Sequence, residues 1–189
     1  MSVLAGLVRW CTGAFVVISI VMHWVRRDLD LFATGISRNQ VGPYGAAMSL
    51  AFALLGIALV LMAVVFARGR AARALFVTAG LGAIMVALFP LPPDAPLVAR
   101  VIHQAGGFAM IAGAIAASVM DSSSAAATVI ARAGAVVFAL FLISGALRET
   151  PLGAVMGFFQ RATLSAICAW MFVVVRTKGR PDGRPLPDS

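Results

Sequence analysis

Long apolar stretches alternate with short polar segments along the whole chain. Six stretches are long enough to cross a bilayer, because a spanning helix needs about 20 mostly apolar residues. They cover approximately residues 4–25, 44–66, 72–89, 101–120, 126–147 and 152–175. No Pro-, Gly- or Ser-rich linker divides them. The pattern therefore predicts an all-α, polytopic membrane protein: one six-transmembrane-helix bundle over residues 1–176, followed by a disordered polar tail over residues 177–189.

Arginine and lysine are distributed unequally between the two ends of this predicted bundle. With six spans, both termini lie at the same end. That end would carry nine basic residues: Arg9, Arg68, Arg70, Arg73, Arg132, Arg176, Lys178, Arg180 and Arg184. The other end would carry five: Arg26, Arg27, Arg38, Arg100 and Arg148. Because basic residues accumulate on the cytoplasmic side of membrane proteins, both termini are expected to be cytoplasmic.

The composition supports a membrane setting and excludes several other classes of protein. Of the 189 residues, 61% are hydrophobic and 12% are charged, whereas a soluble domain has about 25% charged residues. The net charge of +8 therefore indicates basic residues at membrane edges, with membrane lipids as partners and no nucleic acid. Two cysteines provide neither a disulfide framework nor a zinc site. No cofactor is predicted.

Small residues recur at every fourth position on the third and fourth predicted helices. The positions are Ala79, Ala83 and Ala87, and then Ala105, Ala109, Gly113 and Ala117. Small side chains at this spacing let helix backbones approach closely inside a membrane. We expect them to face neighbouring helices of the same bundle.

Polar residues concentrate in the three connections opposite the termini, near residues 26–43, 89–96 and 148–151. Arg161 precedes Val175 by fourteen residues. It should therefore lie about 9 Å below the outer surface, given a rise of about 1.5 Å per residue and a core about 30 Å thick. A charge at that depth should face the bundle and have a partner. Asp94 and Glu149 are the nearest acidic residues, and Asp94 is the predicted partner.

The same connections carry a recognisable set of residues. They are Ile36-Ser37, Val41-Gly42-Pro43-Tyr44-Gly45, Phe89-Pro90, Asp94, His103 and Gln160-Arg161. In order and spacing, this set resembles the bacterial membrane family called domain of unknown function 998. The resemblance implies six spans, a place in the bacterial cytoplasmic (inner) membrane and a polar site at the outer face. Two features depart from the family pattern, which typically has Phe-Pro-Thr-Asp in the second connection and Glu where Gln160 stands.

Three functions remain open from the sequence. The first is an extracytoplasmic-facing binding site for a lipid headgroup, a quinone or a partner membrane subunit. Its candidate residues are Arg161, Asp94, His103, Ser37, Tyr44 and Gln160, and His103 and Tyr44 are expected to share one polar cavity with Arg161. Arginine suits phosphate or carboxylate because its planar fork forms two hydrogen bonds at once.

The second function is a hydrolase-like membrane enzyme in which Asp94 and His103 act as an acid–base pair or as metal ligands. The third is a b-type haem protein in which His23 and His103 are the axial ligands. Binding is favoured, since the chain has two histidines in all and protein metal sites usually need about three ligands.

Overall fold

The structure is a computed structural model that describes residues 3–122, 124–147 and 149–178. These residues form six long helices, each long and apolar enough to cross a membrane. They are α1 (Val3–Val25), α2 (Gly45–Val65), α3 (Arg70–Leu88), α4 (Leu97–Met120), α5 (Ala125–Ala146) and α6 (Met156–Lys178). Two short 3₁₀ helices, η1 (Ile36–Gln40) and η2 (Gly153–Val155), lie in the connections. The predicted six-helix, all-α fold is confirmed.

Most helix ends fall within two residues of their predicted positions. Helix α4 begins earlier than predicted, at Leu97, directly after Pro96, whose fixed φ and missing N–H suit the start of a helix. Helix α6 begins at Met156 and continues to Lys178, so the first two residues of the predicted tail are helical. The rest of that tail, residues 179–189, lies outside the described residues.

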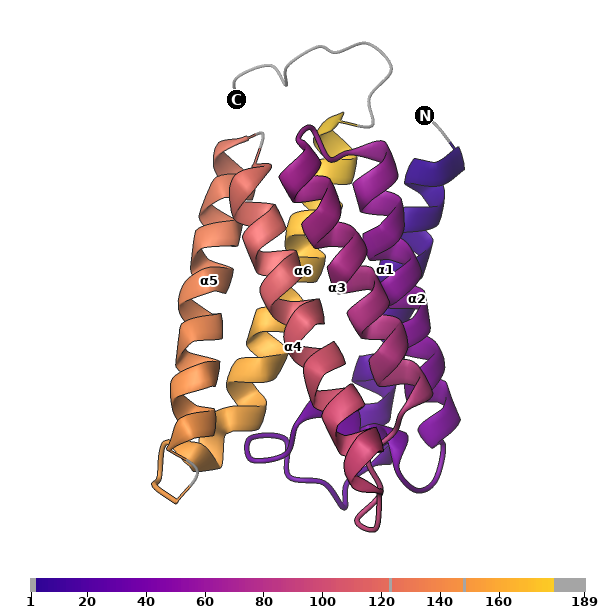
Figure 1. Cartoon of the computed structure of the whole chain (residues 1–189), viewed down its shortest axis with the longest axis vertical. Helices are drawn as coiled ribbons and strands as arrows, with labels where there is room; N and C mark the ends of the chain where they lie inside the picture. The colour runs from indigo at the N-terminus through magenta and orange to yellow at the C-terminus, as the bar shows by residue number, and fades with distance from the viewer. Residues whose placement is uncertain (1–2, 123, 148, 179–189) are drawn as a thin grey trace.

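The helices form a closed ring in chain order. Each helix packs against the next one, and α6 completes the ring by packing against α1. Figure 1 shows the start of α1 and the end of α6 at one end of the bundle, here called the terminal end. The connections α1–α2, α3–α4 and α5–α6 all lie at the opposite end, here called the loop end. The polar segments singled out in the sequence therefore gather at one end of the molecule.

Glycines bring α2, α3 and α4 into close contact. A Cβ atom added to Gly56 would lie 2.7 Å from the carbonyl oxygen of Gly80, and one added to Gly82 would lie 2.5 Å from that of Gly106. Neither position admits a side chain unless the backbones separate. Alanines are the next smallest choice, and all three predicted α3 positions, Ala79, Ala83 and Ala87, are buried.

The predicted stripe on α4 is correct in part. Gly113 faces α3, where an added Cβ would lie 3.0 Å from the carbonyl oxygen of Leu75. Ala117 is also buried, but Ala105 is exposed. The glycine that contacts α3 in the first half of α4 is Gly106, one residue further along the helix.

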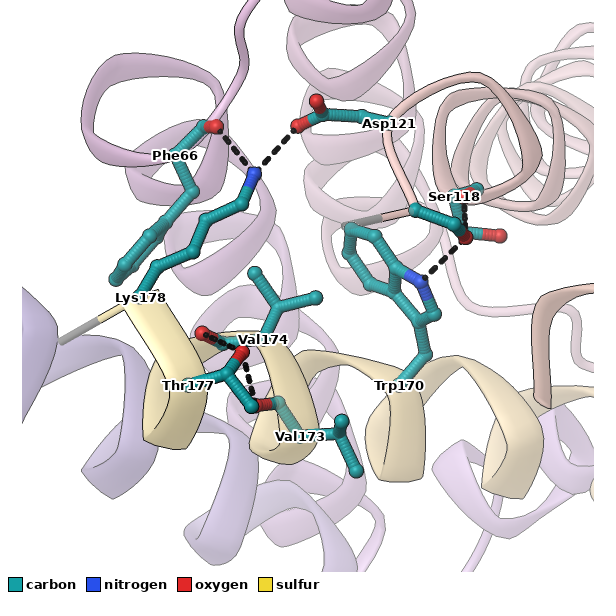
Figure 2. A network of polar contacts seen from close by, with 9 residues as sticks. Phe66, Ser118, Asp121, Trp170, Val173, Val174, Thr177 and Lys178 are labelled. Atoms are coloured by element: carbon teal, nitrogen blue, oxygen red, sulfur yellow. Dashed lines mark hydrogen bonds and ion pairs between the residues drawn. The ribbon is translucent and has the colours of Figure 1, made fainter. Parts of the chain in front are cut away.

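A polar network ties α6 to its neighbours at the terminal end, as Figure 2 shows. Lys178 donates hydrogen bonds to the carbonyl oxygen of Phe66 at 3.0 Å and to the Asp121 carboxylate at 3.2 Å. Trp170, one turn from the middle of α6, donates from its indole nitrogen to the Ser122 hydroxyl at 3.3 Å. These contacts join α6 to the segments that follow α2 and α4.

Candidate functional site

The connection between α1 and α2, residues 26–44, folds across the loop end and is here called the strap. Arg26 closes the strap on itself: it donates to both carboxylate oxygens of Asp28 at 2.8 Å and to the carbonyl oxygen of Val41 at 2.5 Å. This contact raises the pKa of Arg26 and lowers that of Asp28, because each charge is stabilised by the hydrogen bonds between the two side chains. Arg26 was not among the predicted site residues.

The most specific part of the sequence motif shapes the end of the strap. Gly42 has a φ of +91°, a left-handed conformation that glycine adopts without strain. A Cβ atom at Gly45 would overlap the backbone of Gln40. Tyr44 has a φ of 61°, its side chain is 68% exposed and it lines neither cavity described below. The prediction that Tyr44 lines the polar cavity is therefore wrong, since the turn directs it outward.

The strap is fastened to the first turns of α6. The backbone N–H of Phe158 donates to the carbonyl oxygen of Phe32 at 3.0 Å, and their rings stack. Gln160 accepts a hydrogen bond from the backbone N–H of Ile36 at 2.8 Å. Gly157 lies where any side chain would overlap the strap backbone at Thr34. The conformation of the strap therefore depends on α6.

Arg161 is the main link between the strap and α6, but its partner is not the one predicted. Its NH1 nitrogen donates to the carbonyl oxygens of Leu31 at 2.7 Å, Thr34 at 2.5 Å and Gly157 at 3.1 Å. Its Nε donates to Nε2 of His23 at 3.0 Å. The predicted Arg161–Asp94 pair is wrong: the strap, rather than the α3–α4 connection, lies over Arg161 and supplies carbonyl oxygens.

A cavity of about 570 Å³ lies at the loop end, between the strap and the helices α4, α5 and α6. We call it the larger cavity. Its lining residues are Gly35, Ser37, Arg38, Leu91, His103, Gln104, Gly107, Phe108, Ile111, Phe141, Met156 and Gln160. Three of the predicted site residues, Ser37, His103 and Gln160, therefore share one cavity.

His103 is buried in the wall of this cavity, with 5% of its surface exposed. Its Nδ1 lies 2.6 Å from the carbonyl oxygen of Phe89. A carbonyl oxygen only accepts hydrogen bonds, so we assign the ring hydrogen to Nδ1. A neutral ring then has a lone pair on Nε2 that can accept a hydrogen bond from a ligand.

A second cavity, of about 160 Å³, lies between α1 and α6 and is here called the smaller cavity. It is lined by Phe15, Val16, Ser19, Ile20, His23, Ile36, Arg161, Leu164, Ser165 and Cys168. The two cavities share no lining residue. Residues adjacent in sequence line different cavities. Ser37 and Gln160 line the larger cavity, whereas Ile36 and Arg161 line the smaller one.

The predicted single site is thus divided. Asp94 is exposed in the α3–α4 connection and lines neither cavity. The acid–base pair of the enzyme hypothesis, Asp94 and His103, therefore does not share a cavity. His23 and His103, the haem pair, line different cavities. Among the described residues, no group of three His, Cys, Asp or Glu side chains is placed to hold a metal ion.

The sequence did not predict that Ser19 and His23 accompany Arg161. From the sequence, His23 was named only as a candidate haem ligand. Its position at the end of α1, at the level of Arg161, was the available signal. Ser19 lies one turn earlier on the same helix, and nothing in its local sequence distinguishes it.

Nearly the whole chain is similar to a known protein family. A family model described as "Protein of unknown function (DUF998)" matches residues 10–177, which is nearly all of the six-helix bundle. Searches of curated proteins and of solved structures found no significant match.

Proposed function

Because the chain belongs to the DUF998 family of proteins of unknown function, we propose its function from the geometry of the larger cavity. The protein is a multi-pass membrane protein that binds an amphipathic, lipid-class molecule. The polar head of that molecule lies against Ser37, His103 and Gln160, and its tail lies against apolar side chains of α4 and α5. The observation that carries this proposal is a cavity with polar and apolar walls at the loop end.

The size of the larger cavity suits a small-molecule ligand. Its volume of about 570 Å³ falls within the range of roughly 300–1,000 Å³ that ligand pockets occupy. The apolar lining comes from Leu91, Phe108, Ile111, Phe141 and Met156. A mostly apolar pocket with a few convergent polar groups is the usual composition of such sites. A water-soluble polar metabolite would leave these apolar walls unused.

The polar groups of the cavity favour an uncharged head that carries hydroxyl or carbonyl oxygens. The Ser37 hydroxyl has no hydrogen bond to any described residue, so it can donate to a ligand. His103 offers a lone pair on Nε2. Arg38, the cation of the cavity, already donates to the carbonyl oxygen of Leu91 at 3.0 Å and is exposed. A quinone ring and an uncharged lipid headgroup both match this chemistry.

Aromatic side chains pack against one another where α4 contacts α5. The Phe138 ring lies 6.3 Å from that of Phe108 and 6.2 Å from that of Phe141, measured between ring centroids. Helix α5 is the least buried of the six spans. Contact between α4 and α5 is looser than between α3 and α4. We propose that an acyl or isoprenoid tail lies along this seam.

The substitution Gly107→Leu tests the proposal. Gly107 lines the larger cavity, and a Cβ atom added there meets only the Val86 side chain, at 3.8 Å, so the backbone accepts a side chain that occupies part of the cavity. Gly6→Leu is the matched control, because no atom lies within 4 Å of its added Cβ. Lipids and quinones retained by each purified protein are measured by mass spectrometry.

Gly107→Leu is expected to reduce the retained quinone or uncharged lipid by about ten-fold, which corresponds to a loss of about 1.4 kcal/mol, while Gly6→Leu retains as much as the wild type. The molecule that is lost identifies the head. Equal retention by all three proteins contradicts the proposal. Loss of a co-purifying membrane protein, with the lipids unchanged, would instead assign the cavity to a partner subunit.

A further inference from the structure

The smaller cavity contains a cation whose hydrogen-bond partners are all neutral. Arg161 donates to three carbonyl oxygens and to the His23 ring. The ion pairs found among the described residues are Arg26–Asp28 and Lys178–Asp121, so no described carboxylate pairs with Arg161. Asp30, in the strap, attracts Arg161 without forming an ion pair, because its carboxylate is exposed and accepts hydrogen bonds from the backbone of Phe32 and Ala33. A positive charge within a membrane-spanning helix normally has a partner of opposite charge.

Three polar atoms of this cavity's lining residues have no hydrogen-bond partner among the described residues. They are the second terminal nitrogen of Arg161, Nδ1 of His23 and the hydroxyl of Ser19, and all three are buried. Because Nε2 of His23 accepts from Arg161, a neutral His23 ring carries its hydrogen on Nδ1. Buried donors without acceptors are costly, and here Arg161 and His23 both lack one. The missing partner is therefore an acceptor, and its preferred charge is negative.

The rest of the smaller cavity is apolar and elongated along the helices. On α1 it extends from His23 to Phe15, and on α6 from Arg161 to Cys168. At about 1.5 Å per residue, these distances are roughly 10–12 Å towards the middle of the membrane. Val16, Ile20 and Leu164 line this part. The site is polar at the loop end and apolar below it.

The volume limits what the smaller cavity can hold. At about 160 Å³, it is smaller than the roughly 300–1,000 Å³ of a typical ligand pocket. A head and the first part of one chain fit, whereas a whole two-chain lipid does not. Ser165, which lines the cavity, is exposed on the outer surface of the bundle, so the remainder of a chain can continue into the surrounding lipid.

We infer that the seam between α1 and α6 binds the anionic head of a membrane amphiphile, a carboxylate or a phosphate, with Arg161 and His23 donating to its oxygens. The chain of the amphiphile lies against Phe15, Val16 and Leu164. The anion supplies the charge that the strap carbonyls do not. This site is separate from the larger cavity and does not depend on the function proposed for that cavity.

The experiment measures displacement of a fluorescent conjugated polyene fatty acid from the purified full-length protein. Palmitate, hexadecyl phosphate and hexadecanol are the competitors, which have the same chain length and different heads. The variant Ser165→Phe blocks the smaller cavity without removing any hydrogen bond of the strap. Gly6→Phe is its control, because no atom lies within 4 Å of a Cβ atom added to Gly6. Arg161→Lys keeps the charge and loses the second terminal nitrogen. Gly107→Leu narrows the larger cavity instead.

Palmitate or hexadecyl phosphate should displace the probe at concentrations about ten-fold lower than those at which hexadecanol does. The competitor that displaces the probe at the lower concentration identifies the head as a carboxylate or a phosphate. Ser165→Phe and Arg161→Lys should each weaken probe binding by about ten-fold, while Gly6→Phe and Gly107→Leu bind as the wild type does. If Arg161→Lys does not fold, Ser165→Phe decides. Equal displacement by hexadecanol, or unchanged binding by Ser165→Phe, overturns the inference. Loss of binding in Gly107→Leu alone would place the probe in the larger cavity and also overturn it.

Discussion

At the scale of single residues, backbone carbonyl oxygens are the main partners of the buried polar side chains. His103 contacts the carbonyl of Phe89, and Lys178 donates to that of Phe66. Phe89 and Phe66 follow the last residues of α3 and α2. The last carbonyl oxygens of a helix have no partner within it, and the helix dipole favours a cation there. These contacts therefore satisfy groups that lipid could not.

Asp121 offers a prediction at this scale. Its side chain is 5% exposed and its partner Lys178 is 14% exposed, so the pair is shielded from water. Asp121→Ala leaves Lys178 with a single carbonyl partner and should lower the free energy of unfolding by about 1.5–3 kcal/mol, the usual value of a hydrogen bond to a charged group. Thermal unfolding in detergent measures the loss.

Asp94→Ala is the control for this substitution. Asp94 is exposed, and no ion pair to it is found among the described residues. Its replacement should leave unfolding unchanged. Similar unfolding temperatures for the two variants would show that the Lys178–Asp121 contact contributes little to stability.

At the scale of elements, the helices pack in two different ways. Helices α2, α3 and α4 meet through glycines and alanines with almost no space between their backbones. The seams α1–α6 and α4–α5 contain larger side chains and fewer close approaches, and the two cavities lie beside them. The two described cavities therefore lie beside the less tightly packed seams.

Gly113→Leu tests the tightly packed half. An added Cβ at Gly113 lies 3.0 Å from the carbonyl oxygen of Leu75 and 3.3 Å from the Cβ of Ala79. A leucine there must separate α3 from α4, at a cost of about 1–3 kcal/mol for overpacking. Val119→Leu, on a residue that is 47% exposed, is the control and should be neutral. If both variants unfold at the wild-type temperature in detergent, the seam does not limit stability.

At the scale of the whole molecule, the two ends of the bundle differ in structure. At the terminal end Lys178 pairs with Asp121, whereas the strap and the two cavities described above lie towards the loop end. Because successive helices alternate in direction, the first, third and fifth connections, which are the three longer ones, lie at the same end. The count of basic residues predicts that this end faces away from the cytoplasm.

Cysteine labelling tests the orientation. In a variant whose Cys11 and Cys168 are replaced by alanine, Asp94→Cys marks the loop end and Gly69→Cys marks the terminal end. Both positions are exposed. A membrane-impermeant maleimide added to intact cells should label Asp94→Cys only. Labelling of Gly69→Cys alone would invert the topology and place both cavities on the cytoplasmic side.

The sequence by itself determined the six spans, their approximate ends and the gathering of polar connections at one end. These properties follow from local hydrophobic length and from counting spans, so they need no knowledge of how helices pack. It also indicated that Arg161 needs a partner, and it singled out Ser37, His103 and Gln160, which line one cavity. The burial of the small residues of α3 was also predictable from a local pattern, because their four-residue spacing places them on one face of the helix.

Only the tertiary structure decided which groups meet. Adjacent residues on a helix point about 100° apart, so the rotation of α6 places Gln160 in one cavity and Arg161 in the other. The path of the strap placed the carbonyl oxygens of Leu31 and Thr34, rather than Asp94, over Arg161. Both the rotation and the path result from packing between segments more than 100 residues apart, which no local pattern encodes.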